Sequence, residues 1–238
     1  MKRAVLTTIL IIAASVFAEG QEKVISVAQF NAVWQKACEK TKILPHVNTE
    51  TDEDYYDEGK PPHHSYISIT RYLPLDRVWS IDGRKDGSDD QKYEEIRIGR
   101  KSYSRDGKGP WKFKELGFSG LYQCEPEEPT SPGNGTGVGS GSSGGGSGMT
   151  FEYEYRYLGP EGLAPNSPQH YVRIKRMIIT GGGFESQTTF KNSYWIGNSG
   201  SFLKTESTTR IANSPQWSRK LREYDYDAKD LKIEAPIK

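Results

Sequence analysis

Four glutamates stand close together on stretches of alternating polarity, and paired carboxylates are the groups that glycosidic hydrolysis requires. Glu94 and Glu95 precede Ile96, while Glu152 and Glu154 alternate with aromatic residues. Neighbouring strands can hold two such acids about 5–9 Å apart. Acids that alternate with aromatic residues are, however, also typical of the solvent-exposed face of a strand, and no motif marks a pocket around these four. We therefore predict no catalytic residue and no enzymatic activity, and a secreted hydrolase is the least favoured function.

A block of glycine and serine residues matches two catalytic patterns. Residues 141–145, Gly-Ser-Ser-Gly-Gly, match the nucleophile elbow of serine hydrolases, and Gly139, Gly141 and Gly144 match a dinucleotide-binding fingerprint. Both motifs function only between a strand and a helix, and neither element is predicted here. Because a low-complexity Gly/Ser sequence produces such matches by chance, we expect neither chemistry and no cofactor.

Two adjacent histidines, His63 and His64, follow an acidic segment, and they could bind a metal ion together with its carboxylates. A zinc site needs ligands that are held by regular structure and by further hydrogen bonds. Adjacent side chains in an extended chain point apart, and two prolines precede this pair. We therefore expect a solvated loop and no metal.

The overall composition excludes several classes of protein. The chain has 238 residues, of which 34% are hydrophobic and 26% charged, with a formal net charge of +1 and a mean hydropathy of −0.74. Arg173, Lys175 and Arg176 could face nucleic acid beside tyrosines, but nearby acids balance their charge. We expect no nucleic-acid partner and no transmembrane segment in the mature chain.

The first 18 residues have the features of a secretory signal peptide. Lys2 and Arg3 precede an uncharged apolar stretch, and Val16 and Ala18 are the small residues of a cleavage site. A buried N-terminal helix is the alternative. Export would place the mature chain, residues 19–238, in a bacterial periplasm or outside the cell.

Export also affects the chemistry expected of the two cysteines. Cys38 and Cys124 are 86 residues apart, and in an oxidising compartment two cysteines commonly form a disulfide. The alternatives are two buried free thiols, or one reactive cysteine with a histidine. We predict the disulfide.

One amphipathic helix is clear near the N-terminus. Ser26 and Gln29 form a capping-box pattern at its start, and Pro45 follows its end. Its apolar stripe recurs at three- and four-residue spacing and consists of Val27, Phe30, Val33, Trp34, Ala37, Cys38 and Thr41. A sheet is the only partner that the rest of the chain offers for this stripe.

Most of the remaining sequence has the two-residue period of strands separated by hairpin turns. The clearest strand is Phe151–Tyr157, with four aromatic residues on one face and three charges on the other. Residues 47–64 are predicted to form an acidic loop, and residues 129–148 a flexible Gly/Ser-rich insertion. Further strands are predicted at 67–70, 78–81, 93–98, 111–114, 171–180 with a bulge at 175–177, 188–196, 201–209, 224–226 and 231–233.

These elements predict a single domain that is mainly β with an N-terminal helix (α+β). One apolar face on each strand and one helical stripe favour a strongly curved antiparallel sheet, an unclosed half-barrel packed on the helix. The aromatic residues exceed what one helix can cover, so they either fill the interior or line a cavity for an apolar ligand. The candidate lining residues are Phe30, Val33, Trp34, Trp79, Tyr153, Tyr155 and Trp195.

Three stretches resemble the LolA/LolB-like lipoprotein-carrier superfamily, which includes LppX/LprG-type lipid binders. They are the hairpin 194–206, the residues 224–236 that follow it, and residues 95–111 with their strand, glycine turn and tryptophan. The resemblance implies an unclosed β-barrel capped by helices around an apolar cavity for acyl chains. The Gly/Ser block stands where that superfamily has lid helices.

Together these features predict a non-enzymatic periplasmic carrier or sensor that binds a lipid or a lipoprotein acyl chain. The alternative is a structural module of the cell envelope that binds a protein partner through the acidic, tyrosine-rich loop 50–58.

Overall fold

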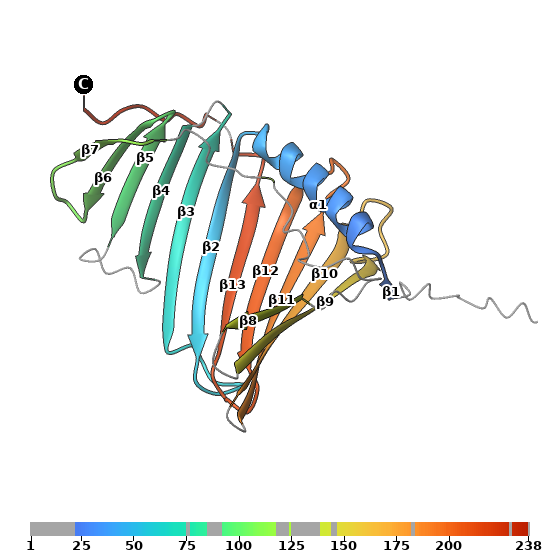
Figure 1. The fold of residues 1–238 in the computed structure, drawn as a ribbon. Coiled ribbons are helices and arrows are strands. Elements are labelled where there is room, and N and C mark those ends of the chain that lie inside the picture. The colour runs from blue at the N-terminus through green and yellow to red at the C-terminus, as the bar shows by residue number, and fades with distance from the viewer. Residues whose placement is uncertain are drawn as a thin grey trace, which may run out of the picture.

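The structure, a computed structural model, describes residues 22–74, 77–84, 92–117, 124, 139–143, 147–181, 184–228 and 230–237. Within these ranges the chain forms one helix and thirteen strands, and all the strands belong to one antiparallel sheet. The sheet bends around the side on which the helix lies, and its two edges stay apart (Figure 1). The predicted fold class is therefore confirmed. The predicted signal peptide lies outside the described residues.

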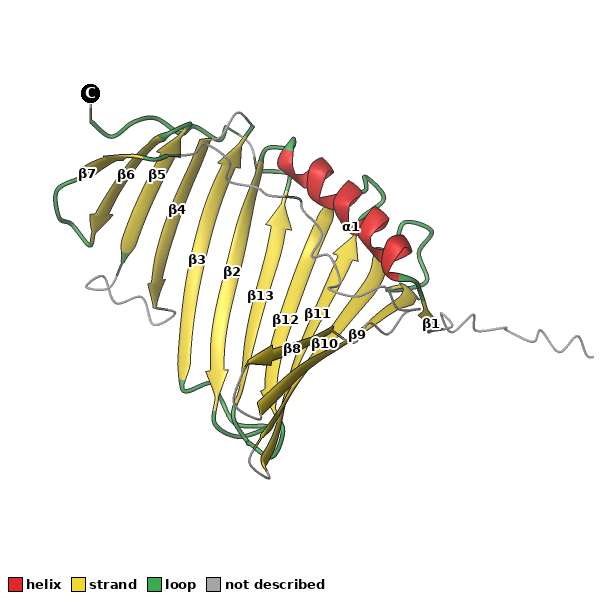
Figure 2. Cartoon of the chain, viewed as in Figure 1, coloured by secondary structure: helices red, strands yellow, loops and turns green. Residues whose placement is uncertain are grey.

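The strands form two meanders. The helix α1 (Val27–Lys42) follows the short strand β1 (Lys23–Val24) and lies across one end of the long strands (Figure 2). The first meander consists of β2 (His46–Tyr55), β3 (His64–Leu73), β4 (Arg77–Arg84), β5 (Tyr93–Ile98), β6 (Lys101–Asp106) and β7 (Lys112–Glu115). The second consists of β8 (Gly139–Ser143), β9 (Ser147–Pro160), β10 (Gln169–Gly181), β11 (Phe184–Ile196), β12 (Phe202–Ile211) and β13 (Trp217–Asp225).

The two meanders become one sheet because β13 pairs with β2. The pairs run from Trp217 opposite Tyr55 to Asp225 opposite Val47, in an antiparallel register. The strand order is β1-β9-β10-β11-β12-β13-β2-β3-β4-β5-β6-β7, and β8 pairs with β9. Apart from this pairing and that of β1 with β9, neighbouring strands are also neighbours in sequence, as predicted.

The helix forms where the sequence predicts it. The Ser26 hydroxyl accepts a hydrogen bond from the Gln29 backbone N–H, and the Gln29 side chain accepts one from the Ser26 N–H, which completes the capping box. Phe30 packs on Tyr155 with ring centroids 4.9 Å apart. At the other end of the helix, the buried Thr41 hydroxyl accepts a hydrogen bond of 3.1 Å from the Phe202 backbone N–H. The helix is thus fixed to the sheet at both ends.

A second core lies at the other end of the sheet. Ile233, only 2% exposed, packs with Ile96 and Tyr103 of β5 and β6. The residues predicted as a last strand at 231–233 form no strand. Their backbone finds no ladder partner, and the buried Ile233 side chain fixes the segment instead.

Residues 47–64 were predicted as an acidic loop, which is wrong: residues 46–55 are the central strand β2. Acidic residues rarely favour strands, but here they alternate between two faces and meet bases of β13. Glu50 pairs with Arg222 on one face, and Glu53 lies 3.6 Å from Arg219 on the other. Opposite charge on the neighbouring strand therefore stabilises a strand that local propensity does not predict.

Two further expectations need correction. The register of β9 and β10 shifts between His170 and Tyr171 and is regular across 175–177, where a bulge was predicted. Within the predicted flexible insertion 129–148, residues 139–143 form β8 and residues 147–148 begin β9. Backbone pairing with β9 needs no side chain, so glycine and serine suffice for β8.

The predicted disulfide is confirmed. Cys38 and Cys124 are bonded, with Cα atoms 5.7 Å apart, and Cys38 is buried beside Ala37, Ile196 and Phe202. The bond attaches Cys124 to the side of the helix that faces the sheet.

We predict that replacing both cysteines, Cys38→Ser with Cys124→Ser, lowers the free energy of unfolding by about 4 kcal/mol, because the bond closes a long loop in the unfolded chain. Urea unfolding of the oxidised protein, the reduced protein and the double variant measures this. The reduced protein and the variant should unfold at similar urea concentrations. Equal stability of the oxidised and reduced proteins would contradict the prediction.

Candidate ligand-binding surface

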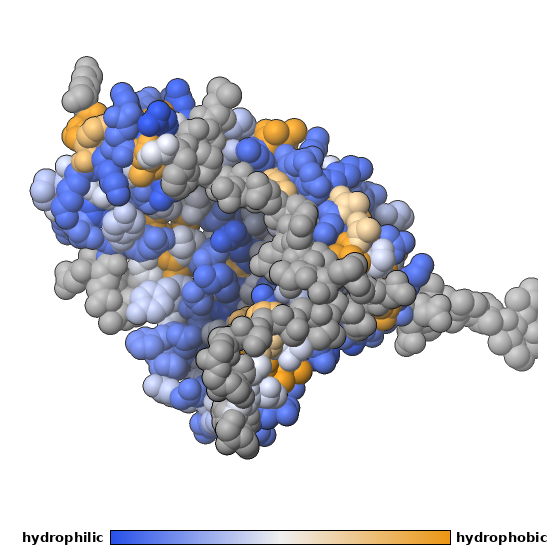
Figure 3. Space-filling view, in the orientation of Figure 1, coloured by the Kyte–Doolittle hydropathy of each residue, from blue (hydrophilic) through white to orange (hydrophobic). Residues whose placement is uncertain are grey.

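Strand register divides every side chain of the sheet between two faces. We call the face that α1 contacts the inner face and the opposite one the outer face. Tyr155 of β9 contacts Phe30 of the helix and lies opposite Arg173 of β10, which in turn lies opposite Asn192 of β11. The inner face is the hollow side of the bent sheet, and hydrophilic residues form much of its visible floor (Figure 3).

The helix fills only the upper end of the inner face. Phe30 packs on Tyr155 and Tyr194, and Trp34 packs on Phe202, with ring centroids 4.9–6.3 Å apart. Tyr155 and Phe202 are buried by these contacts, with exposed fractions of 3% and 5%. These aromatic residues are therefore ordinary core.

Below the helix, the inner face of β9–β11 carries a group of apolar side chains among polar ones. Successive rows across the strands place Tyr153, Lys175 and Phe190 side by side, and then Phe151, Met177 and Thr188. Tyr153 is buried, whereas the other five are only partly buried. We call the group Phe151, Lys175, Met177, Thr188 and Phe190 the inner patch.

On β13 and β2, next to this region, the inner face is charged. Arg222 donates hydrogen bonds to Glu50, and the Lys220 ammonium lies 3.2 Å from Asp52 and 3.5 Å from Glu50. Burial alone would lower the pKa of Arg222, but the Tyr224 hydroxyl and the Glu50 carboxylate raise it above its ordinary value. We call Glu50, Asp52, Lys220 and Arg222 the polar seam. Strand β12 lies between this seam and the inner patch.

The four glutamates considered for catalysis all have basic partners. Glu94 lies 2.7 Å from Arg105 on the outer face, and Glu95 lies 2.7 Å from Arg97 on the inner face. Burial alone would raise the pKa of Glu95, but hydrogen bonds from Arg97 and Ser102 lower it below its ordinary value. These carboxylates therefore have the surroundings of structural ion pairs.

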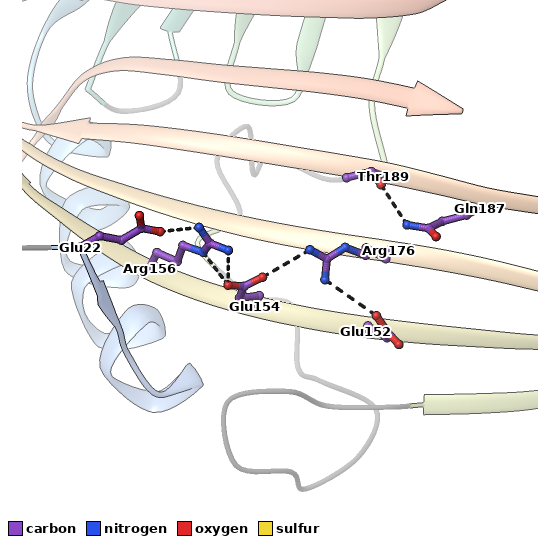
Figure 4. A network of polar contacts seen from close by, with 7 residues as sticks. All are labelled: Glu22, Glu152, Glu154, Arg156, Arg176, Gln187 and Thr189. Atoms are coloured by element: carbon purple, nitrogen blue, oxygen red, sulfur yellow. Dashed lines mark hydrogen bonds and ion pairs between the residues drawn. The ribbon is translucent and has the colours of Figure 1, made fainter. Parts of the chain in front are cut away.

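Glu152 and Glu154 project from the outer face of β9 into a ladder of charges (Figure 4). Arg176 of β10 lies 3.4 Å from Glu154 and 3.8 Å from Glu152. Arg156 bonds both Glu154 and Glu22. Acids and bases on this part of the outer face therefore neutralise one another.

The seven predicted lining residues do not share one surface. Trp79 lies on the outer face, where the Arg71 guanidinium is 4.7 Å from its ring, and Trp195 stacks on His170 at 4.2 Å on the same face. Two-residue alternation assigns residues of one strand to common faces, but it does not say which face is inside. The other five lie at the contact between the helix and the inner face. Phe30, Val33 and Trp34 belong to the helix, and Tyr153 and Tyr155 belong to β9.

None of the residues of the inner patch is among the lining residues that the sequence predicts. Lys175 was considered only beside Arg176 and nearby acids, yet the register puts Lys175 on the inner face and Arg176 and those acids on the outer face. The two-residue period of Phe151–Tyr157 is the signal that could have found it, because Lys175 pairs with Tyr153 of that strand.

The histidine pair lies at the lower rim of the sheet. His63 stacks on Tyr56 with ring centroids 3.8 Å apart, and both line a cavity of about 390 Å³ with Asp54, Ile211 and Trp217. Across the described ranges, no cluster of three or more histidine, cysteine or acidic side chains could hold a metal ion.

Buried His46 closes the upper end of the polar seam. Its ring lies 5.0 Å from that of Tyr72, and its Nδ1 is 2.8 Å from the Leu44 carbonyl oxygen. Burial lowers the pKa of His46 below its ordinary value, and the Arg222 charge lowers it further, although the bond to Leu44 acts in the opposite direction.

Comparison with known proteins found no matching family model and no matching curated protein. Among solved structures, a LolA superfamily protein from Nitrosomonas europaea is 13% identical, covers 87% of this chain and 96% of its own, and has a TM-score of 0.32. A DUF1329 family protein from Desulfovibrio piger is 8% identical with coverages of 87% and 95% and a TM-score of 0.33.

A protein domain from Vibrio parahaemolyticus, described as outer membrane lipoprotein-sorting, is 9% identical with coverages of 87% and 93% and a TM-score of 0.27. Of the helices in the described part of the chain, none has the length and apolar character needed to span a membrane.

We predict that stability falls as the pH drops below 6.5, in part because of His46. The unfolded chain binds a proton at the ordinary histidine pKa, whereas the folded chain resists protonation until lower pH. His46→Gln should therefore give a shallower loss of unfolding free energy between pH 7 and pH 5, measured by urea unfolding. His63→Gln, at the exposed rim, serves as the control and should keep the wild-type slope. A wild-type slope in His46→Gln would refute the prediction.

Proposed function

We propose that the protein is a non-enzymatic carrier or sensor, exported to the periplasm, that binds the apolar part of a lipid-like ligand on its inner face. The supporting observation is the inner patch, where Phe151, Met177 and Phe190 remain partly exposed below the helix. Partly exposed aromatic and apolar side chains on a concave surface are typical of a ligand site.

Simple dimensions explain why the helix leaves this surface uncovered. β10 and β11 have 13 residues each and are therefore about 43 Å long. A helix that crosses them at one end covers a band only about 10 Å wide. At the lower end, Met149 and Ile211 are still 37% and 47% exposed.

The ligand needs little polar recognition for such a surface to bind it. Each methylene that leaves water for an apolar environment contributes about 0.8 kcal/mol, so an acyl chain of about twelve carbons can bind through burial alone. The aromatic rows across β9–β11 supply side chains for this contact.

Two features support export. The predicted signal peptide directs secretion, and the Cys38–Cys124 disulfide is typical of an oxidising compartment. The alternative function, a protein-binding loop at 50–58, loses support because residues 50–55 belong to β2 and their acids meet bases of β13. Only the turn after Tyr55 still fits that alternative.

We predict that the protein binds the neutral apolar probe N-phenylnaphthylamine and that Phe190→Ser weakens this binding about tenfold, since the change removes a large apolar contact. Fluorescence titration measures the affinity. Ile174→Ser, on the outer face of β10, is the matched control and should bind as the wild type does. Native mass spectrometry of protein purified from its own periplasm should show a bound lipid.

Absence of probe binding in the wild-type protein, together with a ligand-free mass spectrum, would overturn the proposed function. Thermal unfolding of each variant establishes that both remain folded at the titration temperature.

A further inference from the structure

Charge is distributed unevenly on the inner face of β9–β12. The described inner-face side chains of these four strands include no acid, and their only charged residues are Arg173 and Lys175 of β10. The outer face of the same strands carries Glu152, Glu154 and Glu206 among its bases. The sheet therefore keeps these two cations on the opposite face from the acids that its neighbouring strands carry.

Lys175 lies within the apolar rows. Its ammonium is 4.8 Å from the centroid of the Phe151 ring and 5.7 Å from that of Tyr153. It is partly buried, and no carboxylate among the described residues pairs with it. Contact with two aromatic rings compensates a cation less completely than an anion does.

The surroundings of Lys175 also define a direction. Toward the helix, Tyr155 and Phe30 are packed against each other and close the surface. Away from the helix, Phe151 and Met177 follow, and then Met149 and Ile179. A ligand that contacts both the ammonium and these apolar rows would place its headgroup toward the helix and its chain toward the lower end.

We propose that the ligand is an anionic amphiphile whose acyl chain lies on the inner patch and whose negatively charged headgroup pairs with Lys175. This inference rests on the proposed function and adds the charge and orientation of the ligand. Arg173 lies two residues along the same face, about 7 Å away on the helix side. A half-buried site of this kind strengthens an ion pair relative to water.

The test compares three probes of matched chain length by calorimetric titration: laurate, dodecyltrimethylammonium and the neutral monolaurin, all below their micellar concentrations. Wild-type protein should bind laurate more tightly than monolaurin, and dodecyltrimethylammonium most weakly. Lys175→Met should weaken laurate about tenfold and leave monolaurin unchanged, because only the ion pair is lost. Lys175→Arg, which keeps the charge, should retain laurate binding.

Lys191→Met is the matched control, since it removes the same charge from the outer face of the neighbouring strand β11. It should bind all three probes as the wild-type protein does. Circular dichroism and thermal unfolding verify the fold of each variant, and Lys175→Arg reports on the charge if Lys175→Met fails to fold.

Equal affinity of the wild-type protein for laurate and monolaurin would overturn this proposal and leave the proposed function intact. Failure of every probe to bind would overturn both. A laurate affinity that falls equally in Lys175→Met and Lys191→Met would also overturn it, because net charge would then explain the effect. Acetate, which carries the anion without the chain, should not compete with laurate; competition at equal concentration would show an anion site without an acyl site.

Discussion

The sheet is continuous because β13 pairs with β2. This pairing joins two meanders that could otherwise form separate sheets, and it places β13 beside the first long strand of the chain, β2. Complementary charge sets its register on both faces, through Glu50 with Arg222 inside and Glu53 with Arg219 outside. The second meander then forms one half of a continuous bent sheet, and α1 packs on that half. The first meander forms the other half.

One sheet then carries two small cores on opposite faces. α1 covers the inner face at the end formed by β9–β13, while the segment around Ile233 covers the outer face at the β4–β6 end. Each apolar stretch needs only a narrow partner, which accounts for a folded chain with only 34% hydrophobic residues. Among the described residues, no helix or extended segment covers the remaining parts of the two faces. On the outer face ion pairs occupy part of that area, and on the inner face of β9–β11 apolar side chains such as Phe151, Met177 and Phe190 occupy part of it.

Local sequence predicted the elements whose signals are strong. The capping box at Ser26 and the stripe through Phe30 and Ala37 identified the helix, and alternation identified Phe151–Tyr157 as a strand. Prediction failed at β2, whose acidic residues obscure the strand and meet their basic partners only on the distant strand β13. It also failed at residues 231–233, which resemble a strand but pack without a ladder. Both failures arise because the deciding partner is distant in sequence.

Patterns between residues a few positions apart are enough to predict the helix, most strands, the hairpin order and which residues of a strand share a face. Tertiary structure alone decided which face is the inner one and which strands meet across the sheet. Trp79 and Trp195 alternate as Tyr153 does, yet they lie on the opposite face from it. Only the register of β9 with β10 puts Lys175 and Glu154 on opposite faces, because a shift of one residue between the two strands would bring them to the same face.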